Sequence, residues 1–126
     1  MLLKTDTKEK FHEIKVAEPH IAANMTAELT VLLNPYLEND IKNIILQLTD
    51  VQTLDTAAAE ALVSIQQNFY DNGASFVICE VQPQVEKFLD EIQLLETMNI
   101  TPTLSEAWDI VQMEEIEREF FDEEED

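Results

Sequence analysis

Asp55 and Thr56 are the residues of this chain whose types and position are best suited to chemistry. They stand between the apolar run at 44–48 and an Ala-rich stretch with helical spacing at 57–69, where a strand leads into a helix. In open α/β sheets, sites are built at such corners. The start of a helix also offers free N–H groups and a positive dipole end, which favour a phosphate. The sequence therefore points to this corner as the candidate site.

Two functions of the corner are compatible with its residue types. Either side chain could cap the helix by accepting a hydrogen bond from an amide one turn on, which is worth ~1 kcal/mol. Alternatively, the Thr56 hydroxyl could accept a phosphate, which would bring about −1.5 to −2 charge to the helix start. A cap can also be a switch, so the residues alone leave both readings open.

Several other chemistries are disfavoured by the sequence. Gly73 is the single glycine, which excludes nucleotide-binding loops that need several. His12 and His20 have neither metal-ligand spacing nor a cysteine beside them. Cys79, the single cysteine, falls in a strand pattern and is expected to be a buried, unreactive thiol. We therefore predict a non-catalytic protein without metal or cofactor.

The charge balance bears on possible partners. The 126 residues hold 7 Lys and Arg against 27 Asp and Glu, a formal net charge of −20. Nucleic acid binding needs basic residues against phosphates, so we exclude it. With no apolar run of ~18 residues, membrane insertion is not expected either. These features predict a cytoplasmic protein, and we expect a monomer or a weak dimer. The chain length predicts one domain over residues 1–113, followed by an acidic extension over residues 114–126.

Hydrophobic periodicity predicts the element order β-β-α-β-α-β-α-β-α. The unit from residue 44 to residue 81 reads strand, helix, strand, so its two strands should be parallel. Pro35 should break the first helix near Asn34. The remaining expected elements are a hairpin over 1–16 with its turn at 8–10, helices over 56–70, from Pro83 and from Thr103, and strands at 44–48, 76–81 and 98–100.

The order of these motifs resembles the STAS domain family, which includes anti-sigma factor antagonists. The motifs are Leu54-Asp55-Thr56, the Ala-rich helix, Gly73, Pro83-Gln84-Val85 and 103–107, in order over roughly residues 8–113. The resemblance implies an α/β fold with a mixed sheet flanked by helices. It also implies a partner-switching function, in which an unmodified Ser or Thr at the corner allows binding to an anti-sigma factor kinase. Phosphorylation of that residue would break the complex.

The chain departs from the family pattern at the corner. The usual phosphoserine position is Ala57 and the following glycine is Ala58, so only Thr56 offers a hydroxyl. Asn24 stands near the position of a family aspartate. The resemblance implies a partner-binding surface made of Asn24, Asp55, Thr56, Ala57, Ala58 and Glu60, with Thr56 as the phosphorylation candidate. The alternative is a constitutive adaptor subunit, for example of a transporter complex, that uses the same corner without phosphorylation.

The acidic extension carries an apolar stripe of Met113, Ile116 and Phe120. Such a stripe can pack back on the domain or dock into a groove of a partner. We favour packing on the domain, because exposed aromatic residues promote aggregation. Beyond Phe121 the acidic run is expected to be disordered.

Overall fold

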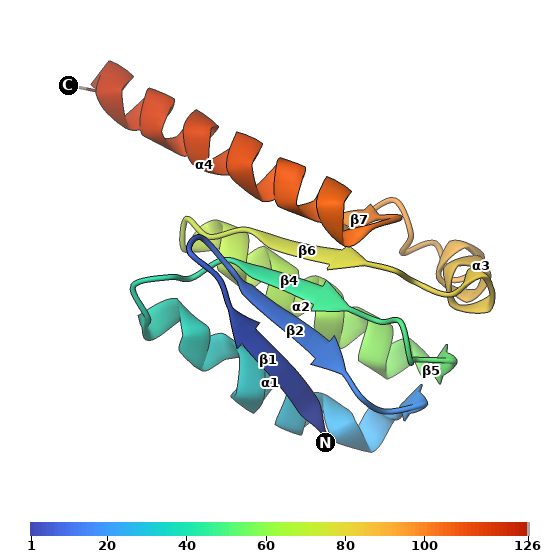
Figure 1. The fold of residues 1–126 in the computed structure, drawn as a ribbon. Coiled ribbons are helices and arrows are strands. Elements are labelled where there is room, and N and C mark those ends of the chain that lie inside the picture. The colour runs from blue at the N-terminus through green and yellow to red at the C-terminus, as the bar shows by residue number, and fades with distance from the viewer. Residues whose placement is uncertain (126) are drawn as a thin grey trace.

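The computed structural model describes the backbone of residues 1–125 and the side chains of residues 1–120. Its main feature is a five-stranded sheet in the order β1-β2-β4-β6-β7 (Figure 1). β1 and β2 are antiparallel, and every other neighbouring pair is parallel. The predicted mixed sheet and the parallel β4–β6 pair are thus confirmed. The strands are β1 (Leu3–Thr7), β2 (His12–Val16), β4 (Ile44–Gln47), β6 (Phe76–Cys79) and β7 (Ile100–Thr101).

Two short strands were missed by the sequence analysis. β3 (His20–Ile21) and β5 (Thr53–Leu54) pair in parallel as a separate two-stranded sheet. Two residues are too few for a recognisable alternation. Two predicted strands also need correction. β6 ends at Cys79, because Glu80 has a φ of 58° and leaves the extended conformation. β7 begins at Ile100 rather than at residue 98.

The helices follow the predicted order. α1 (Thr26–Leu33) gives way to a 3₁₀ helix, η2 (Asn34–Glu38), which confirms the break expected from Pro35. α2 runs from Thr56 to Asp71, and Gly73 adopts a φ of 72° just after it. The remaining helices are η1 (Ala23–Met25), α3 (Pro83–Glu91) and α4 (Leu104–Glu125).

The two faces of the sheet are covered by different helices (Figure 1). Alternate residues of β4 point to opposite sides, as expected for a strand buried on both faces. Ile44 and Leu46 join the large core shared with α1, α2 and α3. Ile45 joins a smaller core, whose other buried members are Phe11, Val77, Cys79, Ala107 and Val111. This face of the sheet is therefore covered by α4, whereas α1, α2 and α3 contribute to the core on the other face.

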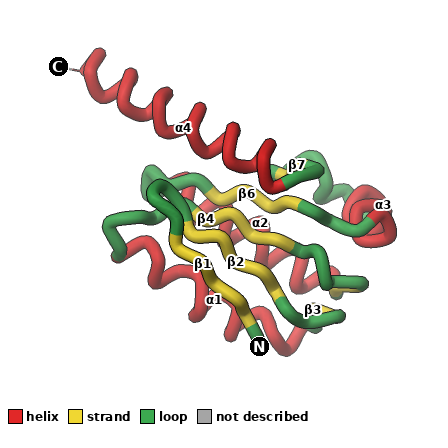
Figure 2. The backbone as a smooth tube through the Cα atoms, viewed as in Figure 1, coloured by secondary structure: helices red, strands yellow, loops and turns green. Residues whose placement is uncertain are grey.

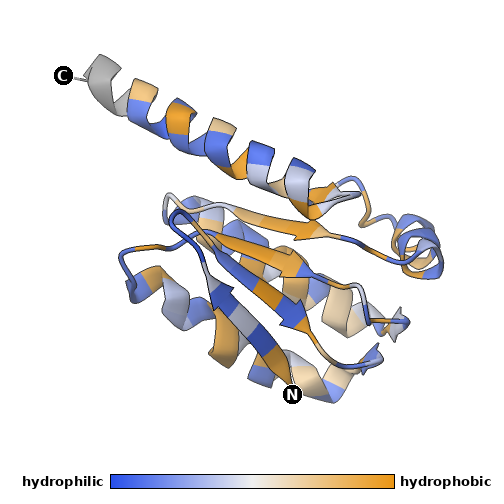
Figure 3. Cartoon of the chain, viewed as in Figure 1, coloured by the Kyte–Doolittle hydropathy of each residue, from blue (hydrophilic) through white to orange (hydrophobic). Residues whose placement is uncertain are grey.

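The C-terminal helix differs from two expectations. α4 continues to Glu125, so the predicted disorder after Phe121 is wrong as far as that residue; Asp126 lies outside the described residues. The apolar stripe does not pack on the domain, because Met113, Ile116 and Phe120 are 60%, 65% and 57% exposed. Figure 3 shows the apolar residues of this projecting half of α4 among polar neighbours.

Candidate functional site

The candidate site is formed where β3 and β5 lie side by side (Figure 2). Their register pairs Ile21 with Leu54, and the Asp55 amide donates to the Ile21 carbonyl at 3.0 Å. The two strands lead directly into η1 and α2. This pairing therefore brings η1, which contains Asn24, beside the first residues of α2.

Asp55 ties the two segments together through its carboxylate. Its backbone occupies the N-cap position of α2 in an extended conformation, with φ −78° and ψ 158°. Its side chain makes no capping hydrogen bond to the helix, so the predicted cap is wrong for this residue. Instead, the Ala23 amide donates to Asp55 Oδ2 at 2.8 Å. The carboxylate thus holds η1 against the helix start rather than completing α2.

His20 completes the corner and was missed as a site residue. Its Nε2 lies 3.3 Å from Asp55 Oδ1, and its Nδ1 lies 2.6 Å from Thr53 Oγ1. The ring bridges β3 to β5 and to the start of α2. Nothing in the sequence pattern links residue 20 with residues 53 and 55. The contact of His20 with Thr53 and Asp55 could not be predicted, because it depends on two short strands that the sequence does not reveal.

The predicted surface residues differ in exposure. Thr56, the first residue of α2, is exposed, as are Ala57, Glu60 and Asn24. Ala58 is fully buried in the large core. In this conformation the side chain of Ala58 cannot contact a partner, and its small size instead lets α2 approach the sheet closely. The exposed part of the predicted surface therefore consists of Asn24, Thr56, Ala57 and Glu60. Asp55 is partly exposed beside them.

The arrangement presents an accessible hydroxyl at the start of a helix. Thr56 is the one hydroxyl residue between Asp55 and Glu60. The first turn of α2 contains no acidic side chain, and Asp55 makes no capping hydrogen bond to it, so the N–H groups at this helix start are left without a side-chain cap from Asp55. Chemically, such a corner can accept hydrogen bonds from a partner or take up a phosphate near the positive end of the helix.

Cys79 is the single cysteine of the chain. Cys79 is buried, as predicted, and burial raises the pKa of its thiol to about 12, which leaves it protonated at neutral pH. Within residues 1–120, no group of three or more His, Cys, Asp or Glu side chains could hold a metal ion. In the same part of the chain, no helix has the length and apolar character needed to cross a membrane.

Comparison with known proteins assigns the family. The family model for the STAS domain matches residues 5–107. The chain therefore belongs to the STAS domain family, and its fold is the α/β fold that the sequence motifs implied. No curated protein sequence matches the chain significantly.

Solved structures support the same fold. The Thermotoga maritima protein TM1081 matches with a TM-score of 0.76 at 18% identity, over 89% of this chain and 90% of that one. An anti-sigma factor antagonist from Mycobacterium paratuberculosis matches with a TM-score of 0.74 at 14% identity, over 88% and 93%. SpoIIAA from Bacillus, an anti-sigma factor antagonist in its unphosphorylated form, matches with a TM-score of 0.68 at 12% identity, over 88% and 96%. At these identities the similarity shows the fold alone.

Proposed function

We propose that this protein is a non-catalytic, cytoplasmic interaction module of a bacterial partner-switching pathway. In this proposal the corner made of Asn24, Asp55, Thr56, Ala57 and Glu60 binds an anti-sigma factor that is also a serine/threonine kinase. Phosphorylation of Thr56 then releases the partner. The observation that carries the proposal is the exposed Thr56 side chain at the first residue of α2. The corner around it is held by the β3–β5 pairing and by the hydrogen bond between Asp55 and the Ala23 amide.

The rigidity of the corner favours binding. Asp55 is bonded to the Ala23 amide and His20 to Thr53, so η1 and the start of α2 hold one arrangement before any partner arrives. A preorganised surface loses less conformational entropy on binding, which leaves more of the contact energy as affinity. The small side chain of Ala57 also lets a partner approach the helix backbone closely.

A phosphate on Thr56 would change this surface strongly. It would add about −1.5 to −2 charge beside the carboxylates of Asp55 and Glu60. A partner surface that fits a neutral hydroxyl would have to bury this charge or move away, and both cost affinity. The domain itself need not unfold, since the hydroxyl is exposed and the N-terminus of α2 is a favourable place for an anion.

One of the similar proteins has been solved in two phosphorylation states. SpoIIAA matches this chain in both its unphosphorylated and its phosphorylated form. For that protein, the fold therefore accommodates both states. As part of the proposal, we extend this property to the present chain. We assign the phosphate to Thr56, because residue 57, where the family usually carries its phosphoserine, is alanine here.

Capture from lysate of the native host tests the proposal. Immobilised wild type, Thr56→Glu and Thr97→Glu are compared, with bound proteins identified by mass spectrometry. Thr97→Glu is the matched control, because Thr97 is also an exposed threonine but lies in the loop after α3. We expect a kinase-type anti-sigma factor on wild type and on the control, and at least about a tenfold loss on Thr56→Glu.

Two further results decide between the functions. Incubation of the captured partner with ATP should place a phosphate on Thr56, detected by peptide mass. Equal binding of one partner by wild type and Thr56→Glu would contradict the switch and favour the constitutive adaptor. Circular dichroism spectra and urea midpoints must match between the variants, so that a loss of binding is not a loss of folding.

A further inference from the structure

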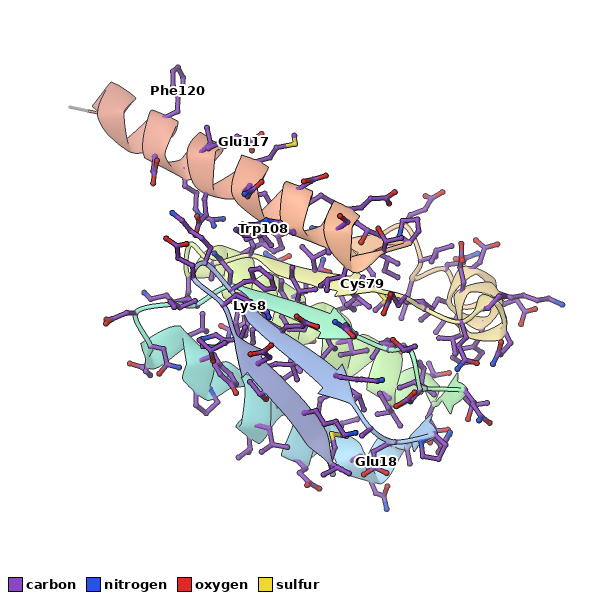
Figure 4. All side chains as sticks on the ribbon, viewed as in Figure 1. Lys8, Glu18, Cys79, Trp108, Glu117 and Phe120 are labelled. Carbon is purple, nitrogen blue, oxygen red and sulfur yellow. The ribbon has the colours of Figure 1, made fainter. Side chains whose placement is uncertain are left out.

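One edge of the five-stranded sheet is formed by β1, and within the described residues no strand pairs with its outer side. Four of its five residues are exposed, and it contains neither a proline nor a bulge. Figure 4 shows this strand between the labelled side chains of Glu18 and Lys8. Such an edge is a template for pairing with another chain, because its backbone N–H and C=O groups are free. The other edge strand, β7, has only two residues. β1 is therefore the edge of this sheet that is available for pairing.

The hydrogen bonds at the two ends of the β1–β2 hairpin show which backbone groups of β1 are free. The Ala17 amide donates to the Leu2 carbonyl at 2.9 Å, and the Lys8 amide donates to the Phe11 carbonyl at 2.8 Å. Bonded and non-bonded residues alternate along an antiparallel pair, so the even-numbered residues of β1 are the ones that bond to β2. The odd-numbered residues turn their backbone groups outward. These residues are Leu3, Thr5 and Thr7.

The charged side chains of β1 do not match those of β2. Lys4 lies opposite Lys15, and Asp6 lies opposite Glu13. Like charges directly opposite one another destabilise a sheet. Asp6 has Lys8 at 2.7 Å as an ion-pair partner, whereas Lys4 has no ion pair with any described residue. The hairpin therefore carries charges that a strand on its outer side could neutralise.

We propose that two copies of the chain pair through β1, antiparallel about a twofold axis at Thr5, and so join two five-stranded sheets into one. This register sets Thr5 opposite Thr5 and Leu3 opposite Thr7 of the other copy, so all the outward backbone groups can bond. It also sets Lys4 of each copy opposite Asp6 of the other. Shifting the register by two residues sets either Lys4 opposite Lys4 or Asp6 opposite Asp6. The charge pattern therefore selects a single register.

The same register compensates the like charges of each hairpin. Across the joined sheet, Lys15 and Lys4 of one copy continue in line with Asp6 and Glu13 of the other. The twofold axis repeats this line in the opposite sense. Each pair of like charges thus faces a pair of the opposite sign, although the whole chain is strongly acidic. The mismatch within the monomer is what makes its edge complementary to itself.

Exposed apolar residues of α1 flank the same edge. The Met1 ammonium donates to the Glu28 carboxylate, so this side of α1 faces the start of β1. Val31 and Leu32 follow Glu28 by three and four residues and lie on the same side, where they are 69% and 37% exposed. α1 packs on the same core as β1 and β2, and two strands span about 10 Å, which is also the distance between packed helices. The α1 helix of a second copy would therefore lie beside these apolar side chains.

Sedimentation velocity of the full chain over a range of concentrations tests the pairing. We expect a reversible dimer for wild type, and a dissociation constant at least about tenfold higher for Thr5→Pro. This substitution removes an outward N–H that the hairpin does not use. Thr5→Val is the matched control, because it keeps the N–H, and it should dimerise at least as tightly as wild type. Circular dichroism spectra and urea midpoints confirm that the Thr5→Pro monomer is folded.

A charge exchange tests the register. Lys4→Asp alone and Asp6→Lys alone each set like charges opposite one another across the axis, and each should raise the dissociation constant at least about threefold. Either substitution improves the charge match with β2, so a loss of folding does not explain a weaker dimer. The double variant, Lys4→Asp with Asp6→Lys, restores opposite charges across the axis. Its dissociation constant should return to within about twofold of wild type.

Hydrogen exchange supplies a measurement without any substitution. The amides of Thr5 and Thr7 should become protected as the protein concentration rises, whereas the Asp6 amide, which bonds to β2, should be protected throughout. The proposal is overturned by any of three results: wild type remaining monomeric at every concentration, equal dimerisation of Thr5→Pro, or a double charge variant as weak as the single ones. The proposed function of the Thr56 corner does not depend on this dimer, so those results would leave it unaffected.

Discussion

The Thr56 corner and the C-terminal half of α4 both expose residues on a helix, but they are held in place differently. At the corner, backbone pairing of β3 with β5 sets the geometry, and the Asp55 carboxylate secures it through the Ala23 amide. α4 is instead held by side-chain hydrogen bonds, which join Glu114 to Tyr70, Glu115 to Asn43 and Arg118 to Ser75. The exposed residues differ accordingly, being small and polar at the corner and large and apolar on α4.

This difference separates two ways of building a contact surface. Small residues beside a hydroxyl suit a contact that a single modification can reverse, because a new charge has a large effect there. An apolar stripe suits a contact that persists, because its strength follows the buried area and depends little on modification. The two surfaces lie at opposite ends of the molecule (Figure 1).

The largest expected effect comes from removing the contacts that fasten α4. Truncation after Val111 deletes Glu114, Glu115 and Arg118 and should leave a folded domain whose free energy of unfolding is about 3 kcal/mol lower, at ~1 kcal/mol for each lost contact. Urea denaturation followed by circular dichroism measures this. Truncation after Phe120 keeps all three residues and is the control. Equal stability of the two products would show that the polar contacts on α4 contribute little.

Asn43→Ala tests the centre of this network. Asn43 is 5% exposed and accepts from the Ser75 amide at 2.8 Å, while its own amide donates to Lys10 and Glu115. The substitution leaves the buried Ser75 N–H without this acceptor, so we expect a loss of about 2 kcal/mol in urea denaturation. Asn39→Ala, at an exposed asparagine, should change stability by less than about 0.5 kcal/mol. A similar loss for both would contradict the assignment.

Asp55→Ala tests the fastening of the corner. It removes the acceptor of the Ala23 amide and the contact with His20, at a half-exposed position, so the expected loss is about 1 kcal/mol. Hydrogen exchange should report faster exchange of the Ala23 amide. Asp50→Ala removes an exposed ion pair with Lys15 and is the control, expected within about 0.5 kcal/mol of wild type. Unchanged protection of Ala23 would show that β3–β5 pairing alone holds η1.

Ile116→Ser should have the smallest effect on stability. Its side chain is 65% exposed, so little apolar surface returns to water, and the change in the free energy of unfolding of the monomer should stay below about 0.5 kcal/mol. Thermal unfolding at low protein concentration measures it. Val111→Ala, on the buried face of the same helix, should cost about 2 kcal/mol. A large loss at Ile116 would mean that the stripe packs on the domain after all.

The sequence by itself determined the elements whose signals are local. The sequence predicted the buried strands β4 and β6, the break at Asn34, the start of α3 at Pro83 and the corner at Asp55 and Thr56. Each rests on hydrophobic periodicity or on the backbone preference of a single residue, and such preferences act within a few positions of the chain.

The tertiary structure alone decided which distant residues meet. His20 joins Thr53 and Asp55 only because β3 and β5 pair, and two-residue strands have no detectable pattern. The three contacts of α4 link residues that are separated by 43, 44 and 72 positions in the chain, so no local signal could show that Glu114, Glu115 and Arg118 face the domain. With that face of α4 taken by polar contacts, Met113, Ile116 and Phe120 had to point to solvent. Their hydrophobicity suggested burial, but the choice of helix face depended on partners that only the folded chain brings within reach.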